Sequence, residues 1–228
     1  LLAAVACLLA PGISTSSAQV VTFQFEAEVV AVIDNGAGDL AGAGVTPGDL
    51  VTGSWTYRID TPDLDPGNPT RGLYAFVQPQ NLMVAVVNGV EFSTDPASVQ
   101  MTVEVKNDSL SVGEHRDSLN VVSSGNLTPP GFSVAPAFIG VVFSDAVAAP
   151  GRPPEFSTAR GDAIPTALFD PTFNLDPGTS LGWNESNRVY IDEFDHFGPL
   201  AGTGFSIVAL IVAIEVCPLL EAAASSQS

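Results

Sequence analysis

The chain has 228 residues, and its 7 Lys plus Arg against 25 Asp plus Glu give a formal net charge of -18. This acidic excess argues against nucleic acid and anionic membrane surfaces as partners, because both require a basic footprint on the protein. Hydrophobic residues make up 46% and charged residues 14% of the sequence, so we expect one folded domain with a substantial core.

The first residues predict an export signal. Residues 1–10 are almost wholly apolar, and small residues at Ser16 and Ala18 fit a cleavage site after Ala18. We therefore expect residues 1–18 to be a signal peptide truncated at its start, and the mature protein to be secreted or held at the cell surface. A buried first helix and a lipoprotein signal acylated at Cys7 are the alternatives.

Alternation of apolar and polar residues predicts strands along most of the remaining chain. The expected strands are residues 22–33, 49–59, 73–77, 81–92 with a turn at Asn88-Gly89, 98–106, 118–122, 137–143, 188–194 and 205–216. The Gly-rich stretch 34–44 predicts a loop, and no segment has the period of an amphipathic helix. We expect an all-β fold, an antiparallel β-sandwich or jelly roll over residues 19–217, followed by a flexible tail over residues 218–228.

Residues 205–214 are nearly all apolar and allow two interpretations. A helix that spans a membrane needs about 20 apolar residues, and this run is too short. Its many β-branched residues favour a strand that is buried on both faces. We therefore expect no membrane span, and Cys217 beyond the run is the only cysteine outside the signal, which leaves no intramolecular disulfide.

Four features in a fixed order resemble a known group of proteins. They are an early strand, the segment 45–57 (VTPGDLVTGSWTY), the acidic loop 60–66 leading to Gly72-Leu73-Tyr74, and the segment 86–93 (VVNGVEFS). The order resembles exported β-sandwich proteins of Gram-negative bacteria that usually end in a PEP-CTERM sorting tail, over about residues 21–216. The resemblance implies surface display or release into an exopolysaccharide matrix, and no catalytic residues. The sorting tail itself is not recognisable in residues 216–228.

One acidic loop is a candidate cation site. Asp60, Asp63, Asp65 and Asn68 place four oxygen ligands within nine residues, and Ca²⁺ takes six to eight such ligands. The spacing differs from that of an EF-hand, because no Gly and no bidentate Glu stand at the required positions. The alternative is a turn stabilised by Asp and Pro between two strands. Calcium is the only cofactor that the sequence suggests.

A second group of polar residues is a candidate for hydrolysis. It comprises Asp192, Glu193, Asp195 and His196. Neighbouring residues of a strand point to opposite faces, so this group is not a ready acid–base pair, and we interpret it as a solvated strand end. Ser180 lies in a G-x-S-x-G pattern without the flanking strand and helix that a serine hydrolase requires, so we interpret the match as coincidence.

Aromatic residues offer a possible sugar-binding surface. Trp55, Tyr57, Tyr74 and Trp183 could stack on sugar rings, but aromatic residues in strands more often belong to the core. We therefore expect a non-enzymatic bacterial surface or extracellular-matrix protein with a structural or binding role, associated with exopolysaccharide, calcium or other extracellular proteins. The alternatives are a subunit that self-assembles through strand edges, and an extracellular hydrolase that uses carboxylates near Asp192.

Overall fold

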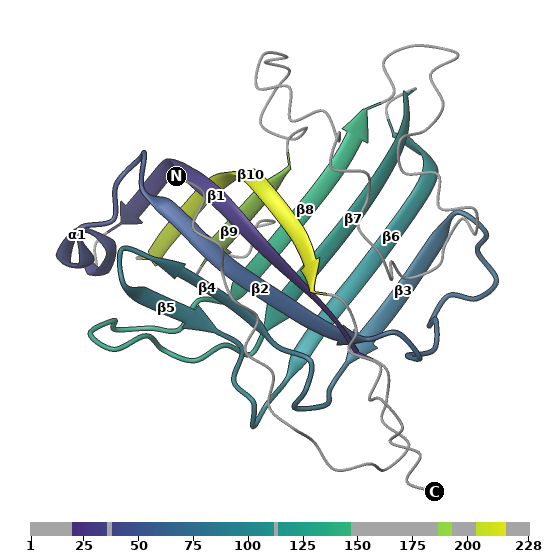
Figure 1. The fold of residues 1–228 in the computed structure, drawn as a ribbon, viewed down its shortest axis with the longest axis horizontal. Helices are drawn as coiled ribbons and strands as arrows, with labels where there is room; N and C mark the ends of the chain where they lie inside the picture. Colours follow the sequence, from purple (N-terminus) through teal and green to yellow (C-terminus); the bar gives the residue numbers. More distant parts are fainter. Residues whose placement is uncertain (1–19, 36–37, 112–113, 147–186, 193–203, 218–228) are drawn as a thin grey trace, which may run out of the picture.

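The chain folds into one antiparallel sheet of ten strands, seen in a computed structural model that describes residues 20–35, 38–111, 114–146, 187–192 and 204–217 (Figure 1). The strands are β1 (Val20–Asn35), β2 (Leu50–Arg58), β3 (Arg71–Phe76), β4 (Met83–Val87), β5 (Val90–Ser93), β6 (Gln100–Ser111), β7 (Glu114–Ser124), β8 (Phe138–Ala146), β9 (Arg188–Asp192) and β10 (Gly204–Cys217). The expected all-β, antiparallel class is confirmed.

The sheet is continuous from edge to edge and curls into a half-barrel. Its strand order is β3-β6-β7-β8-β9-β10-β1-β2-β4-β5, so β3 and β5 are the two edges. Figure 1 shows β1, β2 and β10 crossing in front of β6, β7 and β8. In a sandwich the chain forms two separate sheets, whereas here β9 pairs with both β8 and β10 and joins the two halves. The finer expectation of a sandwich or jelly roll is not confirmed.

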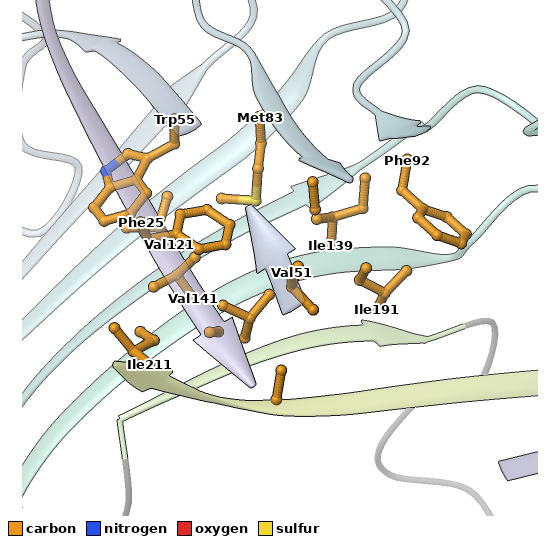
Figure 2. Packing of buried hydrophobic residues seen from close by; sticks show 14 of the residues in the cluster. Phe25, Val51, Trp55, Met83, Phe92, Val121, Ile139, Val141, Ile191 and Ile211 are labelled. Atoms are coloured by element: carbon orange, nitrogen blue, oxygen red, sulfur yellow. The ribbon is translucent and has the colours of Figure 1, made fainter. Parts of the chain in front are cut away.

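Alternation along each strand places one set of side chains inside the curl. In β1, Val21, Phe23 and Phe25 are buried, while the residues between them are partly exposed. A sheet with one face toward a core requires this period of two. Because the pattern extends over most strands, the interior is a single apolar cluster (Figure 2).

Aromatic rings inside the curl connect strands that are distant in the sheet. Trp55 on β2 stacks on Phe23 of β1, with ring centroids 4.8 Å apart, and also contacts Phe143 of β8 at 6.1 Å. Tyr57 on β2 contacts Phe76 on the edge strand β3 at 5.6 Å. These contacts hold the front of the curled sheet against its back.

A short helix corrects the expectation of a loop in residues 34–44. The helix α1 (Asp39–Ala43) buries Leu40 completely in the core. The Asp34 carboxylate accepts hydrogen bonds from the backbone N–H groups of Gly38 and Ala41, both at 3.0 Å. Five residues with one buried side chain give no helical period, so the sequence pattern could not predict this turn.

Two further expectations have different outcomes. The predicted segment 81–92 forms the hairpin β4–β5, and its predicted turn is confirmed by positive φ angles of 48° at Asn88 and 80° at Gly89.

The expectation that β10 is buried on both faces is confirmed only at its start, in residues 204–207. It is wrong further along the strand, where Val212 is exposed. The described part of the chain contains no helix that is long and apolar enough to span a membrane.

Candidate functional site

The predicted calcium loop connects β2 to β3, and its first carboxylate is engaged by an arginine. Arg58 donates two hydrogen bonds to Asp60, from Nε to Oδ1 at 2.9 Å and from Nη2 to Oδ2 at 2.6 Å. The pKa of the Asp60 carboxyl is lowered chiefly by this hydrogen bond from Arg58. A carboxylate held in this way is turned toward its own strand.

Asp63 covers the edge of the sheet. Its Oδ1 atom accepts hydrogen bonds from the backbone N–H groups of Asp65 and Leu73, both at 2.9 Å. The backbone N–H of Leu64 donates to the carbonyl oxygen of Leu73 at 2.7 Å. Leu73 belongs to β3, so the loop satisfies both backbone groups of this residue on the side that faces away from β6.

The last two predicted ligands stabilise the end of the same loop. Asn68 Oδ1 accepts hydrogen bonds from Thr70, from the backbone N–H at 3.1 Å and from Oγ1 at 3.0 Å. Asp65 Oδ2 lies 3.5 Å from Nη1 of Arg71 and accepts a hydrogen bond from Asn68 Nδ2 at 3.4 Å. Within the described ranges, no group of three or more His, Cys, Asp or Glu side chains is arranged to hold a metal ion. The calcium site therefore stays a prediction, and the turn interpretation accounts for each of these bonds.

We expect Asp63→Ala to lower the free energy of unfolding by about 1–3 kcal/mol, because it removes the acceptor of two backbone N–H groups. Urea denaturation in the presence of a chelator measures this loss. Asp60→Ala is the control, because its ion pair with Arg58 is exposed to solvent and contributes little to stability. If Asp63→Ala lowers the free energy of unfolding only when calcium is present, the result would contradict a role of Asp63 in covering the sheet edge. It would support the metal site instead.

Charged side chains on β3 and β6 form a network beside this loop. Glu104 lies 2.7 Å from Nε of Arg71 and 2.8 Å from Nζ of Lys106, measured to its two carboxylate oxygens. Burial acts to raise the pKa of the Glu104 carboxyl, but hydrogen bonds from Lys106 and Arg71, with their charges, lower it below its ordinary value of 4.5. The network ties the edge strand β3 to its neighbour.

We expect Glu104→Gln to cost about 1 kcal/mol at neutral pH, because it removes the charge that two cations share. A carboxyl with a lowered pKa stabilises the fold above its unfolded pKa, and this contribution disappears as the pH falls through the folded pKa. The difference between wild type and variant should therefore shrink below about pH 4.5. Thermal melts across this pH range measure the difference in stability between wild type and variant. A difference that grows as the pH falls would contradict the role of this network. Glu91→Gln, on the edge strand β5, is the control for loss of a charge.

Asp192 is buried, which corrects the expectation of a solvated strand end. Only 1% of this residue is exposed, although it lies on the outer face of the sheet, opposite to the core residues Val189 and Ile191. Its neighbours in register are Phe138 on β8 and Ser206 on β10. Glu193, Asp195, His196 and Ser180 lie outside the described residues, so the rest of this group and the G-x-S-x-G match are not described.

Tyr190 shares the outer face of β9 with Asp192. Burial raises the pKa of the Tyr190 hydroxyl, and the charge of Asp192 raises it further. The ring lies over Gly140 of β8, where an added Cβ atom would come closer than 3.0 Å to it. Arg188, two residues earlier on the same face, has its pKa lowered by burial. The period of two in residues 188–192 indicates that Arg188, Tyr190 and Asp192 share one face, but it does not indicate that Asp192 is buried there.

The described aromatic residues that were candidates for sugar stacking lie in the core. Trp55 and Tyr57 are fully buried and Tyr74 almost so, which makes the stacking interpretation wrong for these three and confirms the core interpretation. The pKa of Tyr57 is raised by burial and by the neighbouring Tyr74. Trp183 lies outside the described residues.

A buried hydroxyl cluster that the sequence did not indicate closes the β5 side of the curl. Thr94 Oγ1 and Ser123 Oγ are 2.7 Å apart, and Ser123 Oγ donates to Asn126 Oδ1 at 2.7 Å. The backbone N–H of Met83 donates to Thr94 Oγ1 at 3.0 Å. A bridge between Thr94 and Asn126 joins the chain after β5 to the chain after β7. These bonds give the cluster a structural role.

Comparison with known proteins assigns no relative to the chain. No protein family, curated protein or solved structure matches it. The resemblance to exported proteins of the PEP-CTERM type therefore stays an expectation drawn from short motifs.

Proposed function

We propose that the protein is an exported, non-enzymatic component of the bacterial surface or extracellular matrix, with a structural or binding role. The observation that supports this most is the use of polar side chains in closing the sheet. Asp63 covers the β3 edge, and Thr94 and Ser123 close the β5 side. A fold that uses its polar side chains in this way suits a stable scaffold outside the cell.

The charge of the outer face supports an extracellular role. Glu26 and Glu28 project from β1 on the face opposite to Ala27 and Val29, which are buried, and Glu215 lies exposed on the neighbouring β10. Together with the net charge of -18, these carboxylates favour solubility and disfavour anionic partners. Neutral exopolysaccharide and other extracellular proteins are the partners that we propose, with calcium as an associated ion.

We also propose that the two halves of the curled sheet pack against each other as the two sheets of a sandwich do. The contact between Trp55 on β2 and Phe143 on β8 supports this, because these strands lie far apart in the sheet and face each other across the core. In this description β3, β6, β7 and β8 form one layer, and β1, β2, β4 and β5 form the other. The strands β9 and β10 join the two layers. The interdigitation of the two inner faces then resembles that of two separate sheets.

The main rival is an extracellular hydrolase acting near Asp192, and it has one observation in its favour. A carboxylate that is 1% exposed beside a tyrosine is the kind of environment that shifts proton affinities at active sites. Self-assembly through strand edges has less support, because the backbone groups of Leu73 on the edge of β3 are already bonded.

Secretion and polysaccharide binding test the proposal. The chain, supplied with an initiator Met and a basic leading segment that complete the signal, should be exported by a Gram-negative host and should begin at Gln19 when its amino terminus is sequenced. Purified protein should then bind bacterial exopolysaccharide in a co-sedimentation assay. Retention of uncleaved protein inside the cells, together with no binding to any exopolysaccharide tested, would overturn the proposal.

A further inference from the structure

The outer face of the central strands carries an exposed apolar patch. Val30 on β1, Leu50 on β2 and Val212 on β10 are 44%, 51% and 47% exposed. Leu210 on β10 is partly exposed on the same face, since its neighbours Ala209 and Ile211 are buried. Contiguous apolar patches on a protein surface mark interaction sites more often than single exposed apolar residues do.

Strand register places two opposite charges on either side of Leu210. Leu210 pairs with Arg188 on one side and with Glu28 on the other. Beyond them, Arg188 pairs with Val142 of β8, and Glu28 pairs with Leu50 of β2. The row across five neighbouring strands therefore reads apolar, positive, apolar, negative, apolar, with Leu210 at its centre.

We propose that a second copy of this chain docks face to face on this row, related by a two-fold axis that runs along β10. Such an axis exchanges the strands on the two sides of β10, so Arg188 of each copy meets the partner's Glu28. The same operation places Val142 against the partner's Leu50 and the two Leu210 side chains near the axis. A two-fold interface requires this self-complementarity of one patch.

Other occupants fit the patch less well. The net charge of -18 opposes an anionic membrane, and the edge contacts of Leu73 oppose pairing through β3. Five strands at a spacing of about 4.8 Å span only about 20 Å, and the outer face of a curled sheet is convex. Since a standard interface buries about 800 Å² per partner, we expect a weak dimer with a Kd in the micromolar range.

Sedimentation velocity of the full chain tests the dimer from micromolar to sub-millimolar concentration. Wild type should show a concentration-dependent dimer that weakens as the salt concentration rises, because the charge pairs are screened. Glu28→Arg alone and Arg188→Glu alone should each raise the Kd at least about tenfold, because like charges then meet across the axis. The double variant should restore the wild-type Kd, since it exchanges the two charges.

Two further variants keep the test decisive. Leu50→Glu changes an exposed residue and should weaken the dimer even if Arg188→Glu fails to fold, which a circular dichroism melt would show. Thr102→Arg, exposed on the outer face of β6 and outside the row, should leave the Kd unchanged. A wild type that stays monomeric at sub-millimolar concentration would overturn the proposal, as would single reversals without effect or a double variant that does not recover.

Discussion

Replacing Trp55 with alanine is expected to lower the free energy of unfolding by about 3–5 kcal/mol. The indole is fully buried, stacks on Phe23 with an interplanar angle of 5° and reaches Phe143 on the opposite side of the curl. The surrounding strands are fixed by their ladders, so the cavity cannot collapse easily. Urea denaturation followed by circular dichroism measures the loss.

Trp55→Phe is the matched variant and should cost much less. The indole Nε1 atom is buried without a hydrogen-bond partner. Figure 2 shows Trp55 among apolar side chains of the core. An unsatisfied buried donor costs about 1–3 kcal/mol, and phenylalanine removes this donor while it keeps an aromatic ring in the stack. Equal losses for the two variants, or a loss below about 1 kcal/mol for alanine, would show that the ring does not hold the two sides of the curl together.

Gly53→Ala is expected to cost at least about 3 kcal/mol or to prevent folding. A Cβ atom at this position of β2 would come closer than 3.0 Å to the ring of Phe25 and to the backbone oxygen of Val84. The ring cannot turn away, because Phe25 is buried and its centroid lies 5.9 Å from that of Trp55. The backbone of β4 would have to move, and β4 is hydrogen-bonded to β2.

Gly67→Ala is the control for this substitution. Gly67 lies in the loop before β3, and no atom lies within 4 Å of the position that its Cβ would take. Its substitution should change the free energy of unfolding by less than about 1 kcal/mol. Thermal melts of both variants provide the comparison. A Gly53→Ala protein that melts like wild type would contradict the close contact between β1, β2 and β4.

The strands could be predicted from the sequence, but the path of the sheet could not. Alternation in residues such as Phe23 and Phe25 depends only on which face is buried, and it persists in any arrangement of strands. Whether β9 pairs with β10 depends on contacts between distant residues, which alternation does not encode. The exposed end of β10 was missed for the same reason, because β-branched residues favour a strand without specifying what covers it.

The acidic loop was located correctly, but the partners of its side chains were not. Oxygen-rich spacing is the same for a cation site and for a turn, and the decision depends on where each carboxylate points. Arg58 and Arg71 flank the loop in the sequence, so their charges could have indicated the pairing with Asp60 and Asp65. The sequence contains no such signal for the burial of Asp192, because the exposure of this residue depends on its surroundings in the folded chain.

The release of sugar from a bound polysaccharide tests the central claim, that this sheet is a scaffold and not an enzyme, most directly. Purified protein is incubated with a bacterial exopolysaccharide that it binds, and new reducing ends are counted over time. The account predicts binding without any increase in reducing ends. Reducing ends that accumulate with wild type and are lost with Asp192→Asn would contradict it.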